Sequence, residues 1–141
     1  ELRSIPKVKI TLDKNYDASS RKLILKVNIS PLSASNGDFR LHACITEDKI
    51  IDSQEDNIIY VKDYEHNHVF RTMLSALEGD ILGSALTLGS DFNKTYEFIL
   101  PPEAGWWVAD NCNVVVFVTD LSQKAFNVGA VLQAAEKKVT E

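Results

Sequence analysis

The sequence predicts an all-β domain, an antiparallel two-sheet β-sandwich of about eight strands. Three observations indicate this fold. Short runs alternate apolar and polar residues at the period of two that strands with one buried face require. Turn-forming residues separate these runs at regular spacing, and no run fits a convincing long helix. With 141 residues, the chain is expected to form a single domain over residues 1–141.

The first three strands are predicted from alternation. Residues 8–12, 23–29 and 39–46 place an apolar side chain at every second position. Residues 13–20 are expected to form a polar connection between the first two strands. After the second strand, the pair Asn36-Gly37 is expected in a tight turn with positive φ.

The middle of the chain allows two interpretations. We expect a turn at residues 47–49, a restarted strand at 50–51 and a polar loop at 52–57. The apolar residues within 58–77 fit a helical stripe, but they also fit a strand over 66–74. We prefer the strand because its neighbours are strands.

The strongest strand signal is Asn-Val-Val-Val-Phe-Val at residues 113–118. β-Branched side chains lose rotamer freedom in a helix and suit a strand buried on both faces. A turn is expected to follow this strand at 119–123. Upstream of it, we expect a long loop with one short edge strand over 78–93, and then a strand over 95–100.

The last segment, residues 128–139, is ambiguous in its composition. Residues 133–138 contain helix-forming residues, but a terminal helix of this length is marginal on its own. We expect a final strand instead, because the spacing suits a hairpin with the preceding strand.

Composition excludes several classes of protein. Fifteen basic and twenty acidic residues give a net charge of −5, and no basic stripe is present, so no nucleic-acid partner is expected. No apolar run reaches the roughly eighteen residues of a transmembrane helix. Because the chain opens at Glu1 without a signal peptide, we expect a mature or excised fragment.

The two cysteines, Cys44 and Cys112, are far apart in the sequence and form no C-x-x-C pair. They therefore offer neither a redox dithiol nor a zinc knuckle. A disulfide between them is possible if their strands face each other across a sandwich. Free buried thiols are the alternative, and the sequence leaves both open.

His66 and His68 are the candidate metal ligands. Two residues apart on a strand, they would point to one face and could hold a divalent metal with Asp63 or Glu65. The sequence specifies no third ligand, so two exposed polar residues are the simpler interpretation. The acidic stretch 48–63 also lacks calcium-loop spacing. We expect no cofactor.

Trp106 and Trp107 are the candidate ligand-binding residues. An exposed Trp on a sandwich can stack on a sugar or anchor a protein interface, and Tyr96 could extend such an aromatic surface. The alternative is that the Trp pair covers one end of the core. No nucleophile elbow or other convergent catalytic set is present, so we expect no enzyme.

Several strings, in order, resemble the Omp-twenty-eight-related outer membrane protein family. They lie at residues 46–51, 64–71, 96–98, 113–118 and 131–136. The resemblance implies the family's C-terminal immunoglobulin-like β-sandwich, which follows an N-terminal thioredoxin-like domain. It implies an exported location in the periplasm, on the outer membrane surface or outside the cell. It carries over no catalytic residue.

Together these observations predict a non-enzymatic accessory or binding domain of an exported cell-envelope protein. Its expected partner is an envelope protein, a glycan or an upstream thioredoxin-like domain. One alternative is a small carbohydrate-binding module that uses Trp106 and Trp107. A less favoured alternative is a metal-dependent hydrolase that uses His66 and His68.

Overall fold

The computed structural model describes residues 7–140 except 57–58, 103–106 and 126–127. Within strands, it describes the backbone alone at 51–56, 59–66, 123–125 and 128–130. Along the described chain, no helix has the length and apolarity needed to cross a bilayer.

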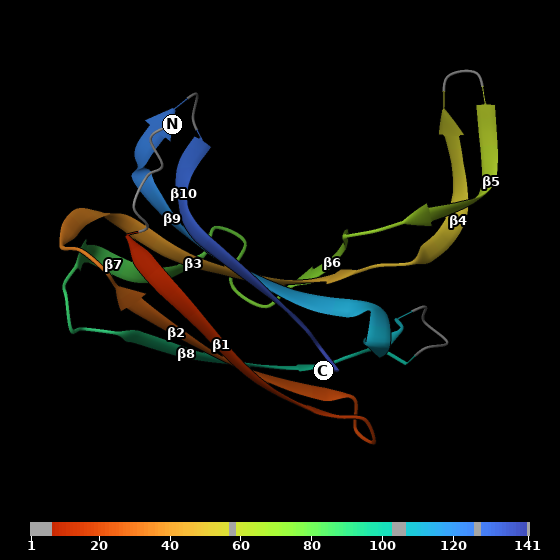
Figure 1. Cartoon of the computed structure of the whole chain (residues 1–141), viewed down its shortest axis with the longest axis horizontal. Coiled ribbons are helices and arrows are strands. Elements are labelled where there is room, and N and C mark those ends of the chain that lie inside the picture. Colours follow the sequence, from red (N-terminus) through yellow and green to blue (C-terminus); the bar gives the residue numbers. More distant parts are fainter. Residues whose placement is uncertain (1–6, 57–58, 103–106, 126–127, 141) are drawn as a thin grey trace.

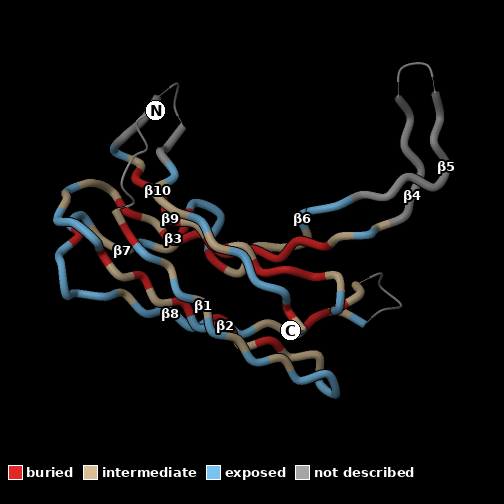
Figure 2. The backbone as a smooth tube through the Cα atoms, in the orientation of Figure 1, coloured by how far each residue is buried: buried red, intermediate tan, exposed pale blue. Residues whose placement is uncertain are grey.

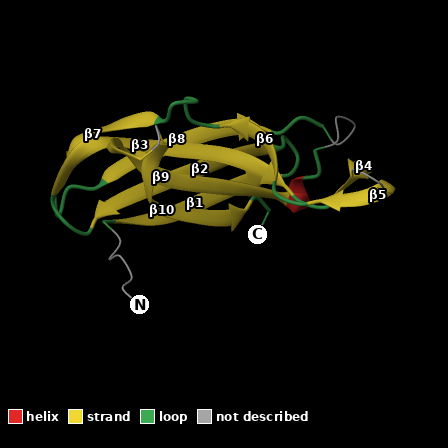
Figure 3. Ribbon diagram, turned by 90° about the horizontal axis from the view of Figure 1, so that it is seen from above, coloured by secondary structure: helices red, strands yellow, loops and turns green. Residues whose placement is uncertain are grey.

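Two antiparallel sheets pack face to face, which confirms the predicted all-β sandwich (Figures 1 and 3). The three-stranded sheet has the order β1-β2-β8, with β1 at Val8–Asp17, β2 at Lys22–Pro31 and β8 at Phe92–Ile99. The five-stranded sheet has β10 (Val128–Lys138), β9 (Cys112–Ala125) and β3 (Ser35–Glu47). β6 (Val69–Met73) and β7 (Asp80–Leu86) follow one another along the other side of β3.

The core lies between the two sheets, where the alternating apolar positions meet (Figure 2). Fully or nearly fully buried members include Leu23, Leu25, Val27, Ile29, Phe39, Leu41, Ala43, Ile45, Val114, Val116 and Val118. The Val-rich strand at 113–118 was predicted to be buried on both faces, but its two faces differ in burial. Its alternate residues Val115 and Phe117 are partly exposed on the outer face of the sheet, so the strand is fully buried on one face.

The predicted polar connection at 13–20 is wrong for its first five residues. β1 continues to Asp17, which pairs with Lys22 of β2. Polar residues are compatible with this strand because alternate positions of β1 face solvent. The turn is confined to residues 18–21, where the Asp17 carboxylate accepts a hydrogen bond from the Ser19 amide at 3.0 Å.

The turns predicted at Asn36-Gly37 and at 119–123 are also wrong, whereas residues 48–49 of the turn predicted at 47–49 do link two strands. Asn36 and Gly37 lie within β3, and φ at Gly37 is not positive. Gly37 is needed for close approach, because a Cβ there would lie 2.6 Å from the Asp120 carboxylate. That carboxylate accepts a hydrogen bond from the Asp38 amide at 3.0 Å, at an irregularity in the β3 register. Residues 119–123 therefore belong to β9, and Asp120 holds a bulge rather than a turn.

β4 (Ile50–Asp56) and β5 (Ile59–His66) form a separate two-stranded sheet that projects beyond the sandwich (Figures 1 and 3). The polar loop predicted at 52–57 is thus strand as far as Asp56, and Asn57 lies outside the described residues. The strand predicted at 66–74 is two elements, because His66 ends β5 and β6 begins at Val69.

The remaining predictions agree with the structure more closely. β7 is the short edge strand expected within 78–93, and β8 begins three residues before the predicted strand at 95–100. β10 confirms a strand rather than a helix at the carboxyl end. A short 3₁₀ turn, η2 (Ala109–Asn111), precedes β9.

Candidate functional site

The hairpin of β4 and β5 leaves the sandwich through two short links. Residues 48–49 join β3 to β4, and residues 67–68 join β5 to β6. Each link contains a residue in the left-handed conformation, with φ of 58° at Lys49 and 53° at His68. Such angles are uncommon for residues other than glycine and change the direction of the chain. Both legs of the hairpin therefore bend where they leave the sandwich.

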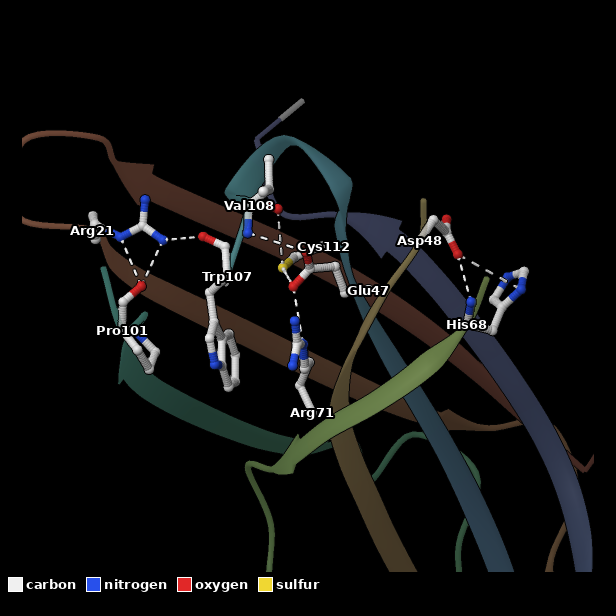
Figure 4. Close-up of polar contacts among 9 residues, drawn as sticks. All are labelled: Arg21, Glu47, Asp48, His68, Arg71, Pro101, Trp107, Val108 and Cys112. Atoms are coloured by element: carbon white, nitrogen blue, oxygen red, sulfur yellow. Dashed lines mark hydrogen bonds and ion pairs between the residues drawn. The ribbon is translucent and has the colours of Figure 1, made fainter. Parts of the chain in front are cut away.

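Hydrogen bonds tie the two links together. The Lys49 amide donates to the Asn67 side chain at 3.0 Å. The His68 amide donates to the Asp48 carboxylate at 2.7 Å, as Figure 4 shows. The second carboxylate oxygen of Asp48 accepts from the Asn113 amide group of β9 at 3.0 Å. The pKa of Asp48 is lowered, first by the hydrogen bond from His68 and also by that from Asn113. The carboxylate thus holds both legs to the sandwich.

Behind these links lies a buried carboxylate, Glu47, which is 2% exposed. Arg71 donates to one of its oxygens at 3.0 Å, and the Val108 amide donates to the other at 3.1 Å (Figure 4). The Cys112 thiol lies 3.6 Å from the first oxygen. Burial of a charge is costly unless it is paired and hydrogen-bonded, and Glu47 has both kinds of partner. We call Glu47, Asp48, Lys49, Asn67, His68 and Arg71 the hairpin base.

The loop that contains Trp107 packs against the hairpin base. The guanidinium carbon of Arg71 lies over the Trp107 ring, 5.3 Å from its centroid. The Phe98 ring is 5.8 Å from the same ring. Arg21 fixes the loop backbone by donating to the carbonyls of Trp107 at 2.6 Å and Pro101 at 2.7 Å (Figure 4). Trp107 is therefore a partly buried residue at one end of the core.

The other candidate aromatic residues are not gathered around Trp107 as a surface. Tyr96 is 8% exposed, and its hydroxyl donates to the Asp80 carboxylate of the opposite sheet. Burial and then this hydrogen bond raise the pKa of Tyr96. Trp106 lies outside the described residues, so its role in glycan binding stays a prediction.

The structure corrects the premise of the candidate metal site. His66 ends β5, whereas His68 lies in the link at positive φ, so the two do not lie on one strand. The side chain of His66 lies outside the described residues. His68 lies 3.8 Å from Asp48 and 3.7 Å from Glu136. Among the side chains that are described, no group of three His, Cys, Asp or Glu could hold a metal ion.

Both cysteines are buried and free. They lie on adjacent strands of one sheet, where Cys44 pairs with Val115 and Cys112 pairs with Glu47. Three register positions separate the two, so they lie on opposite faces of that sheet rather than across the sandwich. Burial, followed by the nearby Glu47 charge, raises the pKa of Cys112 to about 12, and burial also raises the pKa of Cys44. Neither thiol is a ready nucleophile.

Sequence reasoning missed Glu47 and Arg71, the central ion pair of the hairpin base. The alternation of residues 39–46 was a usable signal, because extending it by one residue places Glu47 on the buried face. A carboxylate at a buried position requires a partner. Arg71 is 24 residues further along the chain, and no local pattern specifies the strand register that brings the two together.

Comparisons with known proteins agree with this architecture. A family model described as outer membrane protein Omp28 matches residues 1–141. Among solved structures, a domain of the outer membrane lipoprotein Omp28 from Porphyromonas gingivalis matches with 20% sequence identity and a TM-score of 0.62. The match covers 96% of this chain and 90% of that chain, and at this identity it shows the fold. No curated protein matches the chain.

Proposed function

The chain belongs to the outer membrane protein Omp28 family, and from this premise we propose that it is a non-enzymatic binding domain. In this proposal the sandwich is a rigid support, and the β4–β5 hairpin is the element that contacts a partner. Family membership confirms the predicted exported, cell-envelope location. The proposed partner is another envelope protein, or another domain of the same polypeptide such as the thioredoxin-like domain that the resemblance implies.

One observation carries this proposal: the hairpin extends beyond both sheets, and β4 and β5 pair with each other alone in the described structure (Figures 1 and 3). An isolated two-stranded hairpin is marginally stable in water. The hairpin base fixes the direction of these strands through paired charges and crossed hydrogen bonds. A projecting element held at its origin is suited to present a contact surface away from its own domain.

The chemistry of the hairpin base supports a structural role rather than catalysis. Glu47 is buried and bonded to Arg71 and to a backbone amide, and the Asp48 carboxylate is bonded across the two links. The raised pKa of Cys112 keeps its thiol protonated near neutral pH. These groups are occupied by the fold that they stabilise.

Shortening the hairpin tests the proposal. Ile51 pairs with Glu65, so replacing residues 52–64 by Asn-Gly closes the strands through a two-residue turn. We expect the circular dichroism spectrum to remain β-rich and the melting temperature to change by less than about 3 °C. Mass spectrometry identifies the envelope proteins that crosslink to the intact domain. The shortened domain should no longer crosslink to them.

A matched pair of variants places a photo-crosslinking residue either at Ser53 in β4 or, as the control, at exposed Thr11 on the outer face of the three-stranded sheet. Partners should crosslink from Ser53 and not from Thr11. If the shortened domain retains the same crosslinked partners as the intact domain, the hairpin is not the contact element.

A further inference from the structure

We propose, on the basis of this binding role, that the open edge of β4 binds an extended, positively charged polypeptide segment by strand addition. The outer backbone groups of a sheet edge pair readily with another chain. β4 and β5 form a two-stranded sheet, so each of them has such an edge.

Three other edge strands, β8, β7 and β10, carry features that oppose strand addition. In β8, the exposed Lys94 occupies the same face as the buried Tyr96, with its ammonium 5.8 Å from the centroid of that ring, and a lysine on an edge strand opposes edge pairing. β7 has two register shifts against β3 and a φ of 131° at Gly83. β10 has its own register shifts and lies beside β1, where Lys137 donates to the Leu12 carbonyl at 3.4 Å (Figure 3).

Charge selects the occupant. The hairpin, residues 50–66, contains five carboxylates and one lysine, so it carries −4 of the chain's net charge of −5 with His neutral. The rest of the chain is nearly neutral. Such a concentration of charge on one projecting element favours a cationic partner and raises its rate of encounter.

The same distribution distinguishes the two edges. β4 contains Asp52, Glu55 and Asp56 and no basic residue, whereas β5 contains Lys62 with two acidic residues. Opposite charges on directly paired strands stabilise a sheet, and like charges destabilise it. A basic strand is therefore best placed beside β4. A second copy of this chain is disfavoured as the occupant, because it would bring together two hairpins of charge −4.

The hairpin base prepares this edge for binding. The ion pair of Glu47 with Arg71 and the bonds of Asp48 hold the first residues of β4 in place before a partner arrives. An edge that is already extended and oriented loses less conformational entropy when a third strand pairs with it.

Fluorescence anisotropy with labelled ten-residue peptides tests the inference on the intact chain. One probe alternates Lys and Val, and its matched control alternates Glu and Val. We expect the Lys-Val peptide to bind at least about tenfold more tightly than the control at about 50 mM salt, with the difference reduced at about 500 mM. Failure of the Lys-Val peptide to bind overturns the inference.

Two variants separate the β4 edge from general negative charge. Replacing Asp52, Glu55 and Asp56 by their amides should weaken binding of the Lys-Val peptide at least about tenfold. The control replaces three exposed carboxylates outside the hairpin, Asp13→Asn, Glu78→Gln and Glu97→Gln, and should leave binding unchanged. Equal loss in both variants indicates non-specific attraction and refutes a site on β4.

N-methylated peptides separate strand addition from charge alone. Two Lys-Val peptides carry N-methyl groups on either the Lys amides or the Val amides, so each loses the donors of one edge while keeping its charge. One of the two should bind at least about tenfold more weakly than the unmodified peptide. Equal binding of all three peptides refutes strand addition.

The outcomes for the peptides and for the shortened hairpin can be told apart. Loss of envelope partners on shortening the hairpin, together with no binding of the Lys-Val peptide, retains the proposed function and refutes the basic partner. Retention of partners by the shortened domain refutes both.

Discussion

Replacing Arg71 by methionine removes the cation that neutralises Glu47 while keeping much of the side-chain volume. The carboxylate, 2% exposed, would keep the Val108 amide as a donor but lose the hydrogen bond of 3.0 Å from Arg71. It would then be a buried charge without a counter-charge in this ion pair. We therefore expect Arg71→Met to destabilise the fold strongly.

The magnitude follows from the geometry of the pair. Removing one partner of a buried ion pair costs roughly 3–5 kcal/mol. The Arg71 side chain is 20% exposed, so the pair is partly solvated and the lower value, about 3 kcal/mol, is appropriate. With an unfolding entropy of about 2.1 cal/mol/K per residue, a chain of 141 residues should melt about 10 °C lower.

Thermal unfolding followed by circular dichroism measures this change, with urea unfolding as a second assay. The control is Lys22→Met, which breaks the exposed Lys22–Glu97 pair and should cost under about 1 kcal/mol. Adding Glu47→Gln to the Arg71 variant removes the uncompensated charge and should recover part of the stability. Equal melting temperatures for the Arg71→Met and Lys22→Met variants would refute the assignment of Glu47 and Arg71 as a buried clamp.

Three further predictions concern groups elsewhere in the fold. The pKa of Asp48 is lowered first by the hydrogen bond from the His68 amide. The ionised carboxylate therefore stabilises the fold above the unfolded pKa of about 3.9, and this stabilisation is lost as pH falls through the folded pKa. Asp48→Asn should thus lower the urea midpoint at pH 7, and its difference from wild type should shrink as pH falls below the unfolded pKa and through the folded pKa; a constant difference would contradict this. Cys44 and Cys112 should resist a thiol reagent at pH 8 in the native state and react as two thiols after unfolding without reductant, whereas no reaction after unfolding would indicate a disulfide. Tyr96→Phe removes the hydrogen bond to Asp80 and should cost about 1–2 kcal/mol in urea unfolding, and no loss would show that the two sheets do not depend on it.

Alternation predicted the strands whose two faces differ in burial. It succeeded for β2 and β3, where apolar residues face the core at every second position. It failed where polar residues continue an extended strand, as at residues 13–17 and 52–56. Those segments are extended because a partner strand pairs with their backbone, and pairing between distant segments is not encoded in the local sequence.

The hairpin base was hidden for a related reason. The sequence predicted Glu47, Asp48 and Lys49 in a turn, and Asn67, His68 and Arg71 in a strand over 66–74, with His68 as a candidate metal ligand. Their function depends on the two legs of one hairpin returning to the same place. The register irregularity between β3 and β6, which brings Arg71 to Glu47, is a property of the folded pair alone.

The left-handed residues Lys49 and His68 set the angle at which the hairpin leaves the sandwich. β4 has seven residues, so it extends about 23 Å beyond these bends at the usual rise of a strand. A rotation of about 10° at Lys49 and His68 would displace the far end of β4 by about 4 Å over that length. Substitutions at Lys49 or His68 can therefore change the direction of β4 without changing any residue of β4 itself. The position of the hairpin and the chemistry of its contact surface can thus vary independently.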